Sequence, residues 1–419
     1  MHPNALLELA TELLHRVMRF DSPADGVVSA FFREHRALGA RERHTLAETT
    51  YNVLRNRLLF QHLAQSGKGE MERRLAILGW QGNEGFLRAA LNEQEQHWLE
   101  QVKKVDRTSL PEKLRHNLPE WLAEPLHAEL GNEFWPLVDS MNQSAALDLR
   151  VNTFKAKRDD VQAALAQANI QAVPTPYSPW GLRIDGKPNL AKLDVFTKGE
   201  IEVQDEGSQL LALMTDAKRG EMVVDFCAGA GGKTLALGAA MRNTGMLYAF
   251  DISGHRLAAL KPRLARSGLS NVHPVQIAHE RDARVKRLAG KIDRVLVDAP
   301  CSGLGTLRRN PDMKWRQSPE AIKELTQKQA AILESAARLV KPGGRLVYAT
   351  CSLLDEENEA IARAFIEAHG RDFQPLPASE ILDKAHVSAS QTLVRDEFLR
   401  LWPHRHQTDG FFAAAWERR

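Results

Sequence analysis

The sequence lacks the features of secreted disulfide-rich proteins and of membrane proteins. Its 419 residues include only three cysteines, Cys227, Cys301 and Cys351, and so sparse and odd a set excludes a disulfide framework. No apolar run approaches the ~18 residues that a membrane-spanning helix needs. The first residues also lack the basic-then-apolar order of a secretory signal. We therefore expect a reduced, cytoplasmic protein without a membrane anchor.

A large excess of charge is missing as well. Lys and Arg total 56 against 53 Asp and Glu, a net charge of +3 that does not by itself indicate a nucleic-acid partner. No His or Cys spacing typical of a metal site occurs, so we expect no metal. The composition, 43% hydrophobic and 26% charged, is that of a folded soluble protein. A chain of this length predicts two or three domains.

The N-terminal third has the pattern of helices. Apolar residues recur every three or four positions from Leu6 to Val17, and again between Arg41 and Gln65, where Leu46 and Leu58 fall on one side. Glycine and proline are found mainly between these segments. We expect a helical bundle that ends between residues 90 and 140.

The rest of the chain alternates strand and helix patterns. Short strands around 147–151, 181–184 and 200–203 and a helix around 159–168 predict a small α/β subdomain. From about residue 205, short apolar runs alternate with amphipathic segments and predict a parallel sheet covered by helices on both faces. These runs are 223–226, 247–251, 272–277, 295–298 and 346–349.

A glycine-rich turn follows the first of these runs. Residues 225–234 read Asp-Phe-Cys-Ala-Gly-Ala-Gly-Gly-Lys-Thr, and the second strand ends at Asp251. Glycines let a backbone approach a ligand closely, and an acid at the end of the second strand can accept ribose hydroxyls. The spacing does not fit a phosphate-binding P-loop. These features favour a nucleoside cofactor.

Two of the three cysteines follow buried strands at the edge where this cofactor would bind. Cys301 lies in Asp298-Ala299-Pro300-Cys301-Ser302-Gly303, and Cys351 lies in Ala349-Thr350-Cys351-Ser352. A lone cysteine is usually a small buried apolar residue, the interpretation we favour for Cys227. Two cysteines in matched positions instead suggest thiol chemistry.

Paired thiols beside a methyl donor suit one difficult reaction. The C5 carbon of cytosine is a poor nucleophile until a thiolate adds to C6 and makes C5 enamine-like. A carboxyl group near N3, such as that of Asp298, can stabilise this adduct. A second cysteine can assist release, while spacing alone does not rank Cys351 above Cys301.

These motifs resemble those of the Sun/Fmu-type RNA (cytosine-5) methyltransferases. The similarity rests on Asp225–Thr234, Asp298–Gly303, Ala349–Ser352, Leu307–Trp315, Val203–Gln209 and Asp409–Phe412. It covers about residues 200–415. The helical N-terminus is more loosely similar, through Leu38–Leu59, to the NusB-like RNA-binding domain of the bacterial ribosomal-RNA members. The family's usual Ala-Pro in the glycine turn is Gly229-Ala230 here, a departure that loosens the turn.

The resemblance implies a role for each site residue. Cys351 would be the nucleophile, Cys301 would free the product, and Asp298 would contact the cytosine and the cofactor site. Asp251 would hold the ribose of S-adenosylmethionine, and Asp282 would lie beside its adenine. The turn that wraps the cofactor would comprise Cys227, Ala228, Gly229, Ala230, Gly231, Gly232 and Lys233, the last of which would also serve catalysis.

The resemblance also implies the architecture. We expect a helical NusB-like RNA-binding domain at residues 1–135, a small α/β RRM-like subdomain at 136–204, and a Rossmann-like methyltransferase domain at 205–419. A monomer is the expected state.

Local charge supports an RNA partner. Ten Lys and Arg against three Asp and Glu lie between His255 and Arg294, and a second basic cluster follows Cys301. Such side chains can neutralise phosphates, although a solvated helix face explains much of the first run. Within the second cluster Trp315 is either a stacking surface or a core residue. The predicted RNA-binding residues are Arg308, Arg309, Lys314 and Arg316.

Three functions compete. The first is methylation of cytosine C5 in RNA, most simply small-subunit (16S) ribosomal RNA, with transfer RNA as the alternative substrate. The second is a non-catalytic RNA-binding ribosome-assembly factor, which the intact Cys301, Cys351 and Asp298 argue against. The third is methylation of DNA cytosine or of an amide nitrogen, which needs one thiol or none. A target in a loop or bulge is expected, because the base must leave its stack to meet the thiolate.

Overall fold

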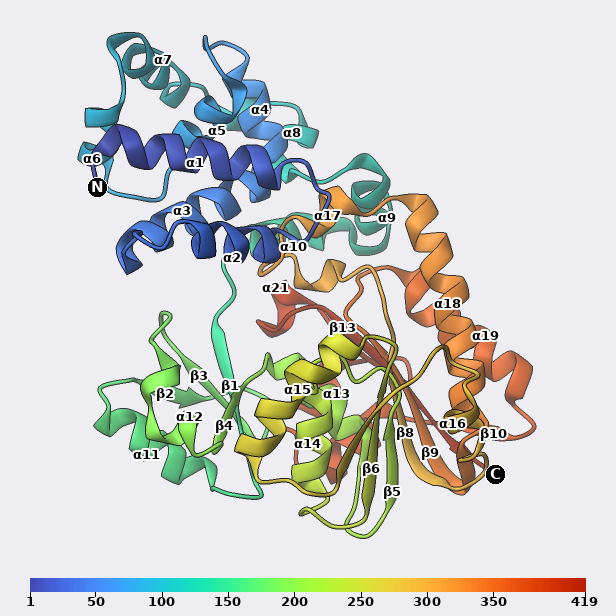
Figure 1. Cartoon of the computed structure of the whole chain (residues 1–419). Helices are drawn as coiled ribbons and strands as arrows, with labels where there is room; N and C mark the ends of the chain where they lie inside the picture. Colours follow the sequence, from blue (N-terminus) through green and yellow to red (C-terminus); the bar gives the residue numbers. More distant parts are fainter. The chain divides into compact units, whose positions relative to one another are not determined.

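The computed structural model describes residues 1–419, which divide into two compact units (Figure 1). Unit 1 comprises Met1–Ser144 together with Thr306–Pro319, and unit 2 comprises Ala145–Gly305 together with Glu320–Arg419. None of the helices combines the length and the apolar character needed to cross a membrane. The domain boundaries predicted at residues 135 and 204 stay predictions, because these two compact units are not the same divisions as the three predicted domains.

Unit 1 contains only helices, which confirms the predicted helical N-terminal region. Its core is formed by the expected apolar stripe of α1, in which Leu13 is fully buried, packed with residues such as Phe31 and Leu54. The helices are α1 Pro3–Val17, α2 Ala24–Glu34, α3 Ala40–Arg55, α4 Arg57–Ala64, α5 Met71–Gly79, α6 Glu84–Ala90, α7 Glu93–Lys103, α8 Glu112–His116, α9 Glu120–Leu130, α10 Phe134–Met141 and α17 Met313–Arg316.

The prediction of one continuous helix between residues 41 and 65 is wrong. The chain forms two helices, α3 and α4, which meet at Asn56. The side-chain amide of Asn56 donates to the backbone carbonyl oxygen of Asn52 at 3.1 Å. Such local side-chain bonds compete with helix continuation. After the break the apolar face changes phase, so that Leu59 is buried while Leu58 is half-buried.

The segment Thr306–Pro319 lies between two parts of unit 2 in sequence but packs with unit 1. The Trp315 indole donates to the Leu54 carbonyl at 2.8 Å, and the Ala24 amide donates to the Asp312 carboxylate at 3.1 Å. Trp315 also contacts the apolar core of unit 1. Of the two interpretations of Trp315, the core residue is the one that the structure supports.

The first part of unit 2 is a small antiparallel sheet with two helices. It contains the three strands and the one helix of the predicted α/β subdomain, and a second helix, Asp194–Thr197, that was not predicted. The strand order is β2-β3-β1-β4, which with the sequence order β-α-β-β-α-β defines a ferredoxin-like arrangement. Short β2 is the strand that the sequence patterns missed. The elements are β1 Leu147–Val151, α11 Arg158–Gln167, β2 Ala172–Pro174, β3 Gly181–Ile184, α12 Asp194–Thr197 and β4 Ile201–Val203.

The larger sheet of unit 2 has the order β11-β12-β13-β9-β8-β5-β6-β7, with β10 paired to β13. Strands β5 to β9 are parallel and confirm the five predicted runs, whereas β10 to β13 join antiparallel and were not expected. The strands are β5 Met222–Asp225, β6 Met246–Asp251, β7 Val272–Gln276, β8 Ile292–Asp298, β9 Val340–Thr350, β10 Phe373–Leu376, β11 Val394–Arg395, β12 Phe398–Leu401 and β13 Phe411–Arg418.

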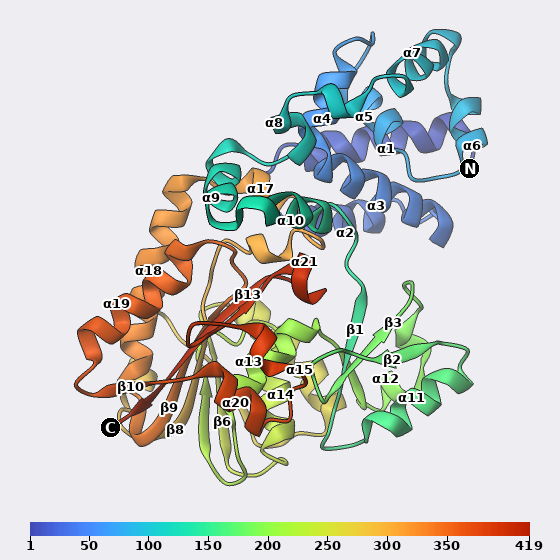
Figure 2. The same cartoon turned by 180° about the vertical axis from the view of Figure 1, so that it is seen from behind.

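Helices cover both faces of this sheet, as the alternating pattern predicts (Figure 2). Neighbouring strand residues point to opposite faces, so Val223 joins the core beneath α13, α14, α15 and α20, while Val224 joins the core beneath α16, α18 and α19. The helices are α13 Glu206–Thr215, α14 Gly232–Ala240, α15 Gly254–Ser267, α16 Ala283–Lys286, α18 Pro319–Ala337, α19 Glu359–His369, α20 Ala378–Lys384 and α21 Pro403–His406.

The Trp315 contact yields a stability prediction. Trp315→Phe removes the donor to the Leu54 carbonyl while keeping most of the apolar contact, and a lost hydrogen bond of this kind costs about 1 kcal/mol. Amide hydrogen exchange across residues 306–319 should therefore become severalfold faster. Trp80→Phe is the matched control, because that indole bonds within its own loop, to the Asn83 carbonyl. Equal exchange rates in wild type and Trp315→Phe would contradict the anchoring.

Candidate active site

The predicted site residues meet at the carboxyl ends of the parallel strands. Strand β5 lies between β6 and β8, so the order of the sheet reverses there, and ligands of open α/β sheets bind at such a reversal. Asp225, Asp251 and Asp298 are the last residues of β5, β6 and β8, and Cys351 directly follows β9. The sheet thereby places a nucleoside-type turn, three acids and a thiol along one edge.

The turn after β5 has two glycines with positive φ, and it requires glycine at Gly231. Gly229 and Gly231 have positive φ angles of 56° and 83°, a region that other residues rarely adopt. A Cβ atom on Gly231 would lie 2.1 Å from Leu260 Cδ1. A Cβ atom on Gly229 would have open space around it, with no atom within 4 Å beyond its chain neighbours. The turn therefore packs against α15 on one side and has room at Gly229.

Asp251 connects this turn to the start of α15. Its side chain is buried, and its two oxygens accept the backbone amides of Gly229 at 2.8 Å and Ser253 at 2.7 Å. A carboxylate oxygen has two lone pairs, so each retains the capacity for another donor. The residue holds the turn in shape and can still accept hydroxyl groups.

Asp225 is the most unusual carboxyl group of the site. One of its oxygens accepts the Thr234 hydroxyl at 2.7 Å, while the other is buried without a hydrogen-bond partner. Burial raises the pKa of Asp225 to about 7, an effect that the Thr234 bond opposes and the charge of Asp298 reinforces. A buried acceptor without a donor at a ligand-binding edge is suited to a ligand N–H or O–H group.

Asp282 follows β7 and caps α16. Its oxygens accept the Ala278 amide at 2.9 Å and the Arg284 amide at 2.8 Å, and these backbone bonds lower its pKa. The carboxylate thus shapes the loop after the third parallel strand. A contact between Asp282 and an adenine ring stays a prediction.

Lys233 and Asp298 form an ion pair across the site. The Lys233 ammonium, in the first turn of α14, donates to Asp298 Oδ2 at 2.8 Å. Burial alone would lower the pKa of Lys233, but the Asp298 carboxylate outweighs it and the net pKa is raised, with a further contribution from Cys351. A protonated lysine therefore lies within electrostatic range of the Cys351 sulfur.

The two predicted catalytic cysteines lie side by side. Their sulfur atoms are 3.4 Å apart, both are free thiols, and the Cys351 backbone amide donates to the Cys301 sulfur at 3.3 Å. Hydrogen bonding to Cys351 and then burial raise the pKa of Cys301 well above its usual range. Burial likewise raises the pKa of Cys227, whose side chain packs against the apolar core. This contact matches the structural interpretation of Cys227.

Backbone contacts join the loops that carry the cysteines. The Gly305 amide donates to the Cys351 carbonyl at 2.8 Å, and the Gly410 amide donates to the Gly305 carbonyl at 2.8 Å. A Cβ atom on Gly305 would lie 2.0 Å from the Gly410 carbonyl oxygen, so the approach excludes any side chain there. The C-terminal motif at Asp409–Phe412 thus contacts the Cys301 loop through Gly410 and stabilises its position.

Sequence reasoning missed one buried acid beside the thiols. Glu357 is fully buried and accepts hydrogen bonds from the residues that follow each cysteine, Ser302 and Ser352. In sequence it ends the acidic run Asp355-Glu356-Glu357, whose first two members are exposed. No local signal distinguishes it from a solvated surface acid.

The predicted RNA-binding residues lie in the segment that packs with unit 1, and none of them is fully exposed. Arg308 and Lys314 are buried, and Arg309 and Arg316 are half-buried. The Lys314 ammonium donates to the Arg55 carbonyl at 2.9 Å, and burial lowers the pKa of Lys314 to about 7. This ammonium therefore serves the packing of unit 1 and does not project into solvent, and contacts of these four residues with RNA stay a prediction.

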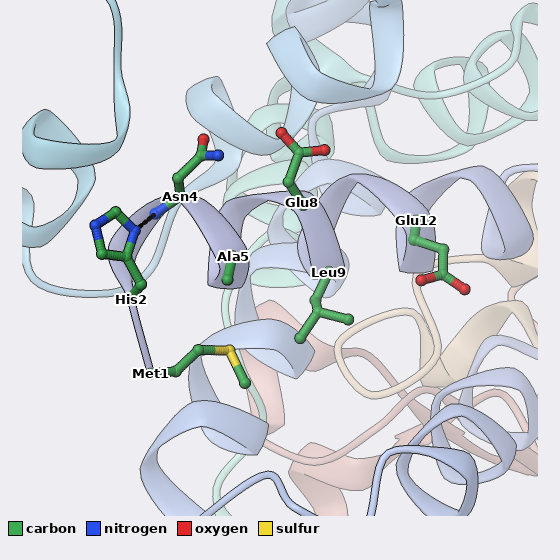
Figure 3. A pocket seen from close by; sticks show the side chains of 7 residues that line it. All are labelled: Met1, His2, Asn4, Ala5, Glu8, Leu9 and Glu12. Atoms are coloured by element: carbon green, nitrogen blue, oxygen red, sulfur yellow. Dashed lines mark hydrogen bonds between the residues drawn. The ribbon is translucent and has the colours of Figure 1, made fainter.

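A hollow on unit 1 contains none of the predicted residues. Figure 3 shows the side chains that line it, with the Asn4 amide donating to His2 Nδ1 at 3.3 Å. The lining residues all belong to the start of the chain and to α1: Met1, His2, Asn4, Ala5, Glu8, Leu9 and Glu12. They include no thiol and no buried acid, so the carboxyl edge of the large sheet is the candidate active site.

Comparisons with known proteins show which family the chain resembles. Residues 212–417 match the family described as "16S rRNA methyltransferase RsmB/F", and residues 118–191 match "Methyltr_RsmF/B-like, ferredoxin-like domain". The chain is 37% identical over 302 residues to a probable ribosomal RNA small subunit methyltransferase B of Synechocystis, covering 72% of this chain and 66% of the relative. The chain is 36% identical over 277 residues to the Bacillus subtilis protein of the same description, covering 65% of this chain and 59% of the relative. The aligned region spans less than two thirds of either relative.

Solved structures show the same fold. The crystal structure of PH0851 has a TM-score of 0.82 and 28% identity, and the match covers 100% of this chain and 99% of that one. A methyltransferase homologue from Pyrococcus horikoshii has a TM-score of 0.63 and 28% identity, covering 75% of this chain and 100% of its own. The large sheet of unit 2 is therefore a Rossmann-like methyltransferase domain. Residues 118–191 and 212–417 of this chain therefore belong to the RsmB/F family of methyltransferases.

The buried Asp225 yields a pH prediction. Its pKa is about 7 in the folded chain and ordinarily 3.8, so the folded state binds the proton more tightly and loses stability as pH rises from about 4 to about 7. Asp225→Asn keeps an acceptor for Thr234 and lacks this titration. Between pH 5 and pH 8 the wild type should lose about 2 kcal/mol more than the variant in urea unfolding without ligand. Parallel pH profiles would contradict the raised pKa.

Proposed function

We propose that this protein methylates C5 of a cytosine in RNA, with S-adenosylmethionine as donor and small-subunit ribosomal RNA as substrate. Relatives described as ribosomal RNA small subunit methyltransferase B support the substrate. The observation that carries the proposal is the pair of thiols, Cys301 and Cys351, 3.4 Å apart at the edge of the sheet that holds the glycine turn. Methylation of nitrogen atoms needs no such pair.

The residues at this edge fit S-adenosylmethionine. The turn from Cys227 to Lys233 has open space at Gly229, Asp251 can accept ribose hydroxyls, and Asp225 has a buried oxygen without a partner. Asp282, after the third parallel strand, is proposed to lie beside the adenine. When bound, S-adenosylmethionine supplies the electrophilic methyl group that C5 of the activated cytosine attacks.

Cys351 is the proposed nucleophile. Its thiolate adds to C6 of the cytosine, a sulfur–carbon bond forms, and the electron pair of the C5–C6 double bond becomes available at C5. The charged Lys233 ammonium lies within electrostatic range of this sulfur. The same ion pair orients Asp298, whose second oxygen can accept a hydrogen bond from the 4-amino group of the cytosine, beside N3.

Cys301 is the proposed base for release. Bonding to Cys351, followed by burial, keeps Cys301 as a thiol in the free enzyme. Once Cys351 is bonded to C6, its sulfur is neutral and no longer holds the pKa of Cys301 up. Cys301 can then lose its proton to solvent and accept the C5 proton. The C5–H electron pair re-forms the C5–C6 double bond, the sulfur–C6 bond breaks, and its electron pair returns to Cys351. Each sulfur ends the cycle ready to exchange protons with solvent.

Exposed basic side chains of unit 2 provide the proposed contact with RNA phosphates. Arg263 and Arg266 pair with Glu202, and Arg294 pairs with Glu221, which leaves the outer faces of α15 and α16 as the accessible basic surface. Its exposed members are Arg256, Lys261, Arg281, Arg284, Lys286, Arg287 and Lys291. Binding through these groups should weaken as salt concentration rises. A monomeric, cytoplasmic enzyme stays a prediction.

The arrangement of the two thiols favours this function over two of its alternatives. A non-catalytic assembly factor would not require the hydrogen-bonded arrangement around Cys301 and Cys351. A DNA cytosine methyltransferase would need only one thiol. Transfer RNA uses the same chemistry, and the experiment below distinguishes it from ribosomal RNA by the species that becomes labelled.

Methyl transfer from labelled S-adenosylmethionine to total RNA tests the proposal. The wild type should label a cytosine in 16S rRNA, and Cys351→Ala should lose at least about a thousandfold in rate because the nucleophile is gone. Cys301→Ala should instead accumulate a protein–RNA adduct that survives a denaturing gel, since release is blocked.

Cofactor binding by equilibrium dialysis is the control, and both cysteine variants should keep the affinity of the wild type for S-adenosylmethionine. Full activity in Cys351→Ala would remove it as nucleophile. Labelling confined to transfer RNA would replace the ribosomal substrate, and labelling of no RNA would refute the proposal.

A further inference from the structure

One buried acid contacts both cysteine loops. Glu357 Oε1 accepts the Ser302 amide at 2.8 Å, and its Oε2 accepts the Ser302 hydroxyl at 2.5 Å and also the Ser352 hydroxyl. Ser302 directly follows Cys301, and Ser352 directly follows Cys351. The carboxylate therefore links the residues that determine where the two sulfur atoms lie.

Other side chains hold Glu357 itself in place. Gln329 of α18 donates to Glu357 Oε1 at 2.9 Å and to the Pro300 carbonyl at 3.0 Å. The Tyr348 hydroxyl, from β9, donates to the Glu357 carbonyl at 2.6 Å. The acid is thus fixed by a helix and a strand of the sheet, and it transmits their rigid positions to the loops.

Burying this carboxylate opposes folding unless its hydrogen bonds compensate. Removing an ion from water is unfavourable, and Glu357 is fully buried with amide and hydroxyl donors in place of a cation. An apolar residue of similar size would avoid that cost. The charge and its four donors are better explained by the precise arrangement that they impose on the loops than by stability.

We propose that Glu357 is a positioning residue that holds Cys301 and Cys351 in contact, so that the second sulfur can act on the adduct formed by the first. This inference deepens the proposed function and rests on it for its catalytic meaning. The negative charge of Glu357 also contributes, after hydrogen bonding, burial and the charge of Cys351, to the raised pKa of the Cys301 thiol. The position of the two sulfur atoms and the raised pKa of Cys301 thus both involve Glu357.

A dithiol probe tests the geometry without any RNA or cofactor. Phenylarsine oxide bonds two adjacent thiols with loss of water, so the full wild-type chain should bind one equivalent that a monothiol does not displace. Glu357→Gln keeps the size of the side chain and removes the charge that two hydroxyls share, and it should weaken binding at least tenfold. Ser352→Ala removes one of the two hydroxyl contacts and should weaken binding by a smaller factor.

Glu221→Gln is the matched control. Glu221 is a largely buried carboxylate of unit 2 paired with Arg294, before β5 and away from the cysteine loops, and its variant should bind the arsenical as the wild type does. Wild-type affinity in both Glu357→Gln and Ser352→Ala would overturn the positioning role. Where Glu357→Gln fails to fold, Ser352→Ala and Ser302→Ala carry the test.

The catalytic consequence has its own readout. In the methyl-transfer assay Glu357→Gln should raise the ratio of trapped protein–RNA adduct to released product severalfold, with the KM for S-adenosylmethionine unchanged. A merely structural loss would lower both adduct and product in proportion. A third outcome separates the two proposals. If Glu357→Gln loses arsenical binding but the wild type methylates no RNA, the positioning role is upheld and only the proposed function is refuted.

Discussion

The contact between the two cysteine loops is the constraint on which the site depends. The sulfur atoms of Cys301 and Cys351 belong to loops that follow different strands, β8 and β9, and residues fifty apart in sequence must meet within 3.4 Å. Parallel pairing of β8 with β9 brings the loops to the same edge. Backbone bonds from Gly305 and the Glu357 carboxylate then close the remaining distance. Loss of that contact would leave two ordinary half-buried thiols.

Electrostatic arrangement gives the neighbouring charges different tasks. Lys233 is held charged by Asp298, whereas Asp225, one strand away, is driven toward its neutral form by burial. The hydrogen bond with Cys351 and burial raise the pKa of the Cys301 thiol. Groups whose pKa is shifted by their surroundings are what acid–base chemistry at one pH requires. The Rossmann-like sheet supplies the edge on which these environments can differ.

The sequence indicated the parallel sheet and the residues on its edge because both leave local signals. Apolar runs that end in Asp251 and Asp298 identify buried strands and their carboxyl ends, and glycines identify the turn at Gly229 and Gly231. Glu357 left no such signal, since its hydrogen bonds include donors from two segments distant in sequence, at Ser302 and Gln329. The packing of Trp315 with unit 1 is likewise a tertiary effect that periodicity does not encode. The break at Asn56 involves a local side-chain bond, which hydrophobic periodicity does not reveal either.

The covalent bond between the chain and its substrate is the central claim, and mass spectrometry tests it directly. An RNA substrate in which cytosine is replaced by 5-fluorocytosine has no C5 proton to lose, so the methylated adduct should remain attached to the wild-type chain in the presence of S-adenosylmethionine. Digestion and sequencing of the cross-linked peptide should place the nucleotide on the sulfur of Cys351. An adduct on Cys301 or Cys227, or methylated product with no adduct at all, would contradict the account.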